Sequence, residues 1–376
     1  MEGDFIKINE WLLPLSWLYG IGVKTRNILF DIGVLKSQSF DVPIISVGNI
    51  TVGGTGKTPH VEYLIELLQN KYKVAVLSRG YKRKSKGFAI ASKESTMRDI
   101  GDEPFQMHTK YPKITVAVDK DRCHGIQTLT ESLPSASSSN SNIDVVLLDD
   151  AFQHRYVSPS LSILLTDQRR PYYSDQLLPY GQLREPREAA RRADIVIVTK
   201  CSREMQPLTY RIIEENLHLQ AHQQLFFSQI VYEELHPLFP EQAPDLRLDQ
   251  LGGSHEATLV VGIANPGPFL QAIAQHCEQA YPLIFADHHD FQPADFQRIQ
   301  AQLDKLNDPE APLITTEKDA ARLRHHPLLP EGWKKRLYYL PIRIGFQQQR
   351  GPEFDQIIQQ HIQLFYEQQN RNCHLG

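Results

Sequence analysis

Short apolar runs alternate with segments of helical periodicity between residues 42 and 198. Helical spacing is clear in residues 59–68, which follow the first run. Continuous β-branched runs of this kind are typical of parallel strands that are buried on both faces by helices. The pattern therefore predicts an α/β fold with a mostly parallel sheet. The six runs are Val42–Val47, Lys73–Leu77, Ile114–Val118, Asp144–Leu148, Leu161–Leu165 and Ala193–Val198.

The pattern changes after about residue 205 and predicts a second, smaller α/β domain. Gln224–Tyr232 is predicted to be a strand leaving the first domain, and Arg336–Ile344 its returning partner. Strand candidates between them are Thr258–Gly262, Pro282–Phe285 and Pro312–Thr315. The predicted organisation is an N-terminal region (1–40), a main domain (41–223), linker strands (224–255 and 330–350), a smaller lobe (256–329) and a C-terminal helix (351–376).

An apolar run, Trp11–Val23, stands near the N-terminus and carries no charge. Its thirteen residues are fewer than the roughly 20 that a membrane-spanning helix needs. Leu15, Leu18 and Tyr19 share one helical face, and Lys24 and Arg26 follow at once. Two interpretations stay open: an interfacial helix at an anionic lipid surface, or an amphipathic helix docked on its own domain.

The amino-acid composition is that of an ordinary globular protein and excludes few functions. Apolar residues make up 41% and charged residues 22%, which is ordinary for a globular protein. A net charge of -4 gives no general attraction to nucleic acid, so none is expected as a partner. The four cysteines form no CxxC pair, which fits a reducing compartment. The low-complexity segment Ser135–Asn142 is predicted to be a surface loop.

The strongest chemical signal is the glycine-rich segment Ser46–Thr58, between a predicted strand and a predicted helix. Such a loop turns backbone N–H groups around the phosphates of a nucleotide such as ATP. The residues expected to line it are Gly53, Gly54, Thr55, Gly56, Lys57 and Thr58. Lys57 is expected to reach the β- and γ-phosphates, and Thr58 to bind Mg²⁺. The common pattern has glycine where this chain has Thr51, so the match is partial.

Two acids follow the fourth apolar run. Asp149 and Asp150 come at the end of a predicted buried strand, and ligands bind beyond the carboxyl ends of parallel strands. We expect one of them to hold Mg²⁺, directly or through water. The alternative is that both only begin a turn or cap a helix.

Two families of P-loop proteins resemble this loop. Dimerising switch ATPases carry a lysine just before the glycine pair, which reaches the phosphates of the partner subunit. This chain has Val52 at that position, so it lacks the key residue of that family. The longer stretch Val47–Pro59 resembles the tetraacyldisaccharide 4'-kinase family, which phosphorylates the lipid A precursor. Further motifs of that family follow in order up to about residue 320. They are Ser78–Tyr81, Gly101–Pro104, Asp121–Arg122, Leu148–His154, Leu183–Pro186, Asp287–Phe291 and Thr316–Asp319.

The resemblance implies a kinase that moves the γ-phosphate of ATP to the 4'-hydroxyl of tetraacyldisaccharide 1-phosphate, giving lipid IVA. It also implies peripheral attachment to the cytoplasmic face of a Gram-negative inner membrane. Lys57 and Thr58 would serve phosphate and Mg²⁺, with the metal shared by the two acids. Asp102 and His288 would pair to activate the sugar hydroxyl. Positions associated with lipid or phosphate handling are matched by Arg79, Tyr81, Arg122, Gln153 and Arg184.

The chemistry of phosphoryl transfer agrees with these expectations, since a sugar hydroxyl needs a carboxylate or imidazole to accept its proton. Without the family resemblance, the motif around Asp102 is more typical of the start of a helix. His288 alone is more typical of a histidine on the protein surface. A basic run between Arg79 and Lys86 could meet the substrate phosphate or form a solvated loop. Alternatives from other classes are a nucleotide-switch ATPase without a lipid acceptor and a non-catalytic ATP-binding scaffold.

Overall fold

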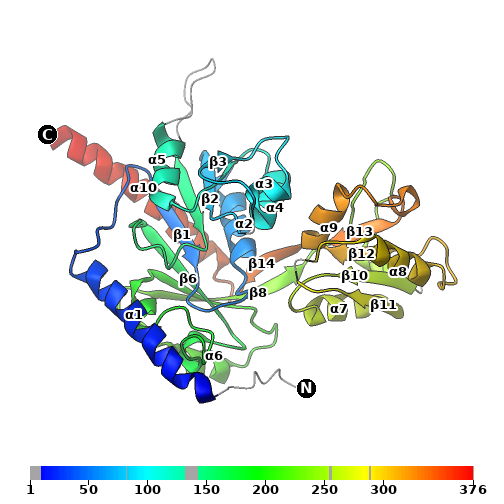
Figure 1. Ribbon diagram of the computed structural model, residues 1–376, viewed down its shortest axis with the longest axis horizontal. Helices are drawn as coiled ribbons and strands as arrows, with labels where there is room; N and C mark the ends of the chain where they lie inside the picture. The colour runs from blue at the N-terminus through cyan, green and yellow to red at the C-terminus, as the bar shows by residue number, and fades with distance from the viewer. Residues whose placement is uncertain (1–9, 82, 132–142, 254–255, 288, 376) are drawn as a thin grey trace. The chain divides into compact units, whose positions relative to one another are not determined.

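The chain forms two compact units, each built around its own sheet (Figure 1). The structure, a computed structural model, describes residues 10–81, 83–131, 143–253, 256–287 and 289–375. The loop predicted at Ser135–Asn142 lies outside these ranges. One unit contains the residues up to Gln229 and those from Ile344 onward, and the other contains Ile230–Arg343.

The first unit carries a nine-stranded sheet in the order β14-β8-β7-β6-β1-β5-β2-β4-β3. The pairs between β8 and β4 are parallel, as the apolar runs predict, whereas the edge strand β3 is antiparallel to β4. Its strands are β1 (Ile44–Gly48), β2 (Val74–Ser78), β3 (Ala89–Ile90), β4 (Thr115–Val118), β5 (Val145–Asp149), β6 (Leu161–Asp167), β7 (Ile195–Thr199), β8 (Gln224–Tyr232) and β14 (Ile342–Phe346). The short β3 has no counterpart among the predicted runs.

Helices cover both faces of this sheet, so its central strands are buried throughout (Figure 1). They are α1 (Leu13–Asp31), α2 (Lys57–Leu68), α3 (Met97–Ile100), α4 (Asp102–Lys110), α5 (Arg122–Glu131), α6 (Pro207–Leu217) and α10 (Gly351–Leu375). Short 3-10 helices occur at Glu10–Leu12, Tyr172–Ser174 and Arg187–Arg192.

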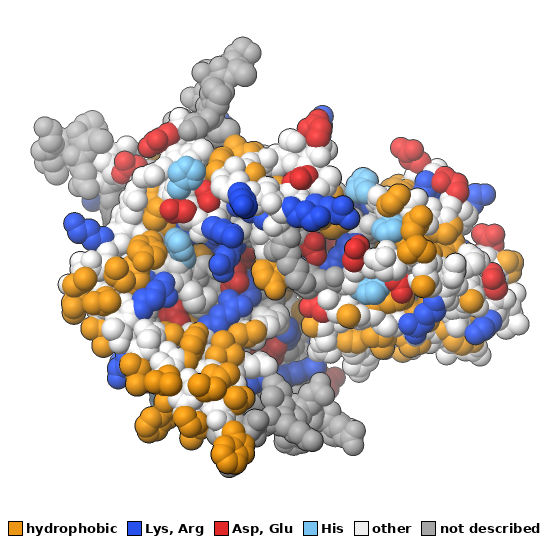
Figure 2. All heavy atoms as spheres, viewed as in Figure 1, with side chains coloured by type: hydrophobic (Ala, Val, Ile, Leu, Met, Phe, Trp, Pro, Cys, Tyr) orange, Lys and Arg blue, Asp and Glu red, His pale blue; other side chains and the backbone are white. Residues whose placement is uncertain are grey.

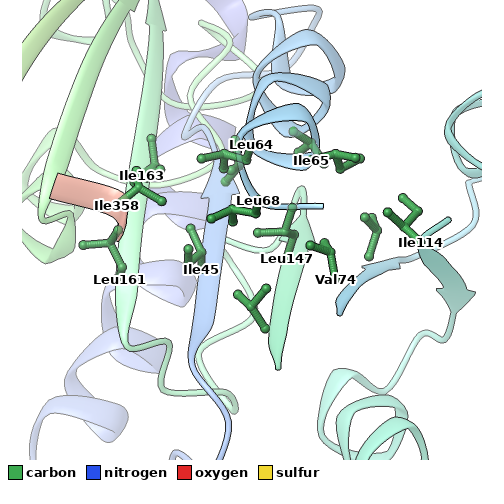
Figure 3. Close-up of a cluster of buried hydrophobic side chains, with 14 of the residues drawn as sticks. Ile45, Leu64, Ile65, Leu68, Val74, Ile114, Leu147, Leu161, Ile163 and Ile358 are labelled. Atoms are coloured by element: carbon green, nitrogen blue, oxygen red, sulfur yellow. The ribbon is translucent and has the colours of Figure 1, made fainter. Parts of the chain in front are cut away.

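Alternate residues of each central strand enter different cores. Ile45 of β1 and Leu147 of β5 pack with Leu64 of α2 on one face (Figure 3). Ile44 and Val146, their chain neighbours, pack against the opposite core with α5. Because side chains of a strand alternate between faces, this two-sided burial accounts for the continuous apolar runs. The C-terminal helix joins the first core through Phe354, Ile358 and Ile362, at helical spacing.

The second unit has a five-stranded sheet in the order β11-β10-β12-β13-β9. Its strands are β9 (His236–Pro237), β10 (Glu256–Val261), β11 (Gln279–Ile284), β12 (Leu313–Thr316) and β13 (Leu337–Leu340). Its helices are α7 (Gly267–Ala274), α8 (Pro293–Leu303) and α9 (Glu317–Arg324), with 3-10 turns at Leu248–Gly253 and Glu331–Trp333.

The predicted returning strand Arg336–Ile344 is divided in the structure. Its first part is β13 of the small sheet, and its second part is β14, next to β8 in the large sheet. The division falls at Pro341, which has no N–H to donate to a ladder. One predicted strand thus supplies a strand to each sheet.

Candidate active site

The glycine-rich loop connects the end of β1 to the start of α2. Gly53 has a φ of 106° and Gly56, the N-cap of α2, has a φ of 89°. Both angles lie in the left-handed region that residues with a Cβ rarely adopt. Gly54 does not have a positive φ. Of the glycines expected to line the loop, Gly53 and Gly56 therefore make the left-handed turns.

Thr51 fits the loop because the backbone is extended at this point. It forms an antiparallel bridge with Leu183, and the N–H of Val52 donates to the carbonyl of Gln182 at 2.8 Å. The amide of Asn49 donates to the hydroxyls of Thr51 at 3.3 Å and Thr55 at 2.9 Å. A glycine at residue 51 is unnecessary where the chain pairs as a strand, so the partial motif match has a structural reason.

The two acids lie beside this loop. In the parallel pairing of β1 with β5, Val47 is the register partner of Asp149. Asp149 is buried, and Asp150 is half-buried with a φ of 49°. Asp150 Oδ1 lies 3.6 Å from Nζ of Lys57. The loop lysine and the strand-end acids are thus in one place, as the sequence predicts.

Asp149 has an unusual environment for a carboxylate. Burial raises its pKa to about 7, and the nearby Glu103 and Asp150 add to the shift, while Lys57 and Arg122 oppose it. Its Oδ2 accepts a hydrogen bond from the Ser78 hydroxyl at 3.3 Å. Its Oδ1 is buried and has no hydrogen-bond partner among the described residues. A buried oxygen without a donor is what a carboxylate offers to a divalent cation, so the acids fit a Mg²⁺ site.

Two arginines contact these acids. Arg184 Nη1 lies 3.3 Å from Asp150 Oδ2, so Asp150 is shared between Arg184 and Lys57. Arg122 is buried and donates to the backbone carbonyls of Asp119 at 2.5 Å and Asp149 at 3.3 Å. Burial lowers the pKa of Arg122 to about 10, against the opposing effect of Asp149 and Asp150. In this conformation Arg122 binds the backbone at the end of β5.

The remaining predicted substrate residues lie on segments that meet near the acids. Gln153 donates its amide to the Asn49 carbonyl at 2.7 Å. Tyr81 is exposed, and Arg79 is close enough to influence Arg122 electrostatically. A Cβ on Gly101 would lie 3.0 Å from the Tyr81 carbonyl, so this glycine permits the Ser78–Tyr81 motif to approach the start of α4.

Asp102 is the first residue of α4 and is half-buried, which agrees with the predicted helix start. His288 lies outside the described residues, in the sequence of the second unit. Their pairing therefore remains a prediction.

Sequence reasoning did not single out three residues of the loop and acid region. Glu103 and Ser78 act on Asp149, and Asn49 ties the loop hydroxyls together. Each stands next to or within a motif that the sequence showed. Ser78 is the last residue of β2, so its position at a strand's carboxyl end was the available signal.

Helix α1 rests on the same region through polar contacts. Ser16 donates to the Leu177 carbonyl at 2.9 Å, Tyr19 to that of Arg184 at 2.8 Å, and Arg26 to that of Gln153 at 2.7 Å. Most of its large apolar side chains are exposed, whereas Phe30 near its end is buried, and Figure 2 shows hydrophobic side chains gathered where α1 lies. The most exposed are Trp17 (73%), Leu18 (66%) and Ile21 (61%), and Trp11 (89%), in the 3-10 turn just before the helix, is exposed as well. No described helix is long and apolar enough to span a membrane.

A glycine-rich loop between a buried strand and a helix, with acids ending the neighbouring strand, defines a P-loop nucleotide-binding protein. A model of the tetraacyldisaccharide-1-P 4'-kinase family matches residues 8–363. The chain belongs to this family of kinases. The predicted family resemblance is thereby confirmed.

Relatives agree over nearly the whole length. The tetraacyldisaccharide 4'-kinase of Parabacteroides distasonis is 54% identical over 357 residues, covering 95% of each chain. That of Bacteroides thetaiotaomicron is 49% identical over 379 residues, covering 99% of this chain and 97% of the relative. The crystal structure of LpxK from Aquifex aeolicus in complex with ATP has a TM-score of 0.70 at 29% identity, covering 94% of this chain and 99% of that one.

Proposed function

We propose that the protein transfers the γ-phosphate of ATP to the 4'-hydroxyl of tetraacyldisaccharide 1-phosphate, giving lipid IVA. The observation that carries this proposal is the meeting of Lys57, Asp149 and Asp150 at the glycine-rich loop, in a chain of this kinase family. The solved relative that contains ATP supports ATP as the phosphate donor. We further propose that the two compact units are the main domain and the smaller lobe expected from the sequence.

The phosphate end of ATP is assigned to the loop. The N–H groups of Thr55, Gly56 and Lys57 would hold the phosphates at the N-terminus of α2, where the helix dipole favours negative charge. Lys57 would then exchange its contact with Asp150 for one with the γ-phosphate. Mg²⁺, held by Thr58, Asp149 and Asp150, would neutralise charge on the phosphates when bound.

The acceptor is assigned to Asp102 and His288. As the bond between the γ-phosphorus and the ADP oxygen breaks, the 4'-oxygen forms the new bond to phosphorus and its proton passes to this pair. Arg79, Tyr81, Gln153 and Arg184 would contact the lipid disaccharide or its phosphate. Arg122 would keep the end of β5 in place, which suits its burial and its hydrogen bond to the Asp149 carbonyl.

The first prediction tests phosphoryl transfer itself. Wild-type protein with γ-labelled ATP and tetraacyldisaccharide 1-phosphate should yield a bisphosphorylated lipid, in an acceptor-dependent reaction. Lys57→Ala should lower turnover by about a hundredfold or more, because its charge meets the transferring phosphate. Lys71→Ala, on the exposed surface of the same unit, is the matched control. ATP hydrolysis at a rate that does not depend on the lipid would indicate a switch ATPase. ATP binding without any turnover would indicate a non-catalytic scaffold.

The second prediction concerns the metal. Asp149→Asn and Asp150→Asn should each raise the Mg²⁺ concentration needed for half-maximal rate by about tenfold or more, because a neutral amide is a poor Mg²⁺ ligand. Asp41→Asn, an exposed position in the first unit, should behave as wild type. Titration of the initial rate with MgCl₂ measures the effect. An unchanged Mg²⁺ response in both variants would mean that the acids are structural.

The third prediction concerns the proton acceptor. Asp102→Ala and His288→Ala should each reduce turnover, and the double variant should be little worse than the more damaging single one, since the residues act together. The Michaelis constant for ATP should change much less than the turnover number. His276→Ala, an exposed histidine of the second unit, is the control. Losses that multiply in the double variant would show that the two residues act independently.

We also propose that α1 attaches the enzyme to the cytoplasmic face of the inner membrane. The helix is docked on its own domain by polar contacts and presents most of its apolar side chains outward. It can therefore be both a docked helix and an interfacial helix at a lipid surface. Exposed tryptophan and leucine side chains are suited to the headgroup boundary of a bilayer, and the nearby Lys24 and Arg26 to anionic lipid. Outward exposure of Trp17 and Leu18 carries this proposal.

The fourth prediction tests this attachment without disturbing the helix contacts. Trp17→Ser/Leu18→Ser should reduce the fraction that sediments with anionic vesicles by about tenfold or more in partition coefficient. Leu208→Ser/Ile212→Ser, which removes comparably exposed apolar side chains from α6, is the control. Equal sedimentation of the two double variants would contradict the proposal.

A further inference from the structure

Three consecutive backbone carbonyls of the phosphate loop are each held by a side chain. The carbonyl of Gly54 accepts a hydrogen bond from Lys200 Nζ, and that of Thr55 accepts one from the Thr199 hydroxyl at 2.8 Å. The carbonyl of Gly56 lies 2.7 Å from His60 Nδ1. We propose that His60, Thr199 and Lys200 are positioning residues that aim the loop's N–H groups at the phosphates of the nucleotide. This proposal rests on the assignment of ATP to the loop.

The planar trans peptide explains how a held carbonyl directs an amide. Within one peptide unit the C=O of a residue and the N–H of the next residue point in opposite directions. Fixing the carbonyls of residues 54, 55 and 56 therefore also fixes the directions of the N–H groups of Thr55, Gly56 and Lys57, because each points opposite to the carbonyl of its own peptide unit. Successive amides that point the same way form the concave anion site that a phosphate needs.

Thr199 and Lys200 come from the carboxyl end of β7, two strands away from β1 in the sheet. Thr199 is buried, so its hydroxyl has a fixed partner set that also includes the Thr166 carbonyl at 3.3 Å. Lys200 has a φ of 55°, and its ammonium also contacts Asp167 Oδ2 at 2.7 Å. The paired Asp167, at the end of β6, keeps the lysine oriented toward the loop.

His60 holds the third carbonyl from within α2. A carbonyl only accepts, so Nδ1 carries the proton and donates to Gly56, while Nε2 accepts from the Ser228 hydroxyl at 3.0 Å. With one ring nitrogen donating and the other accepting, the imidazole is neutral in this arrangement. Ser228, in β8, thus orients the imidazole of His60, which in turn holds the Gly56 carbonyl of the loop.

These three residues differ from Lys57 and Thr58, whose assigned partners are the phosphates and Mg²⁺. They face the protein side of the loop and bind its backbone, so their effect on the nucleotide passes through the amides. Their removal should weaken recognition of the phosphate chain while leaving recognition of adenosine unchanged. A purely structural role would instead lower stability and affect both ligands alike.

The test compares ATP with adenosine in binding titrations and measures kcat and KM for ATP. Thr199→Val keeps the side-chain shape and removes the donor, and should weaken ATP binding by about five- to tenfold relative to adenosine, the size of one lost hydrogen bond. Thr199→Ser should restore the wild-type ratio. Thr258→Val is the control, because Thr258 is fully buried in β10 and its hydroxyl has no partner among the described residues.

Lys200→Met provides a second variant at a partly exposed site, where folding is less at risk. It should also reduce the affinity for ATP relative to adenosine, with a thermal midpoint close to that of wild type. An unchanged ratio of the two affinities in both variants would overturn the proposal, whether or not the thermal midpoint falls. A wild-type protein that binds no ATP would instead overturn the proposed function on which it rests.

Discussion

The parallel pairing of β1 with β5 is the constraint on which the site depends. It brings Val47, near the end of β1, level with Asp149, so that loop and acids start from neighbouring strand ends. The approach is close: a Cβ on Gly48 would lie 2.7 Å from Cβ of Phe152. Only glycine leaves room there, because a contact this short would force the 149–152 segment away from the loop.

Charge balance around these strand ends follows from that geometry. Two carboxylates at adjacent positions would repel each other, and Asp149 is also buried, which raises its pKa. Lys57, Arg184 and Arg122 offset this cost from three different elements. The negative charge of Asp149 and Asp150 is therefore suited to binding a cation. Lys57 can exchange its contact with Asp150 for one with a phosphate.

Helix α1 shows the reverse of the usual arrangement for an amphipathic helix on a globular protein. Its small and polar residues make the contacts, and a Cβ on Gly20 would lie 2.9 Å from the Leu177 side chain. Apart from the buried Phe30, most of the large apolar residues are left outside, which costs stability in water unless another apolar phase covers them. Tyr19 donates to the Arg184 carbonyl, so the helix is anchored next to an arginine that contacts Asp150.

The sequence by itself determined the sheet, the loop and the acids, because each rests on local chemistry: apolar runs, glycines and strand-end carboxylates. Gln224–Tyr232 is a strand with the bounds that its pattern predicts. The tertiary structure alone decided the rest. Thr51 in the loop, the division at Pro341 and the hydrogen bonds from Thr199 and Lys200 to the loop carbonyls depend on partners more than a hundred residues away or on a neighbouring strand. The burial of Arg122 likewise depends on the end of β5, which lies 27 residues away in the chain. Sequence periodicity carries no record of such partners, since they are chosen by packing in three dimensions.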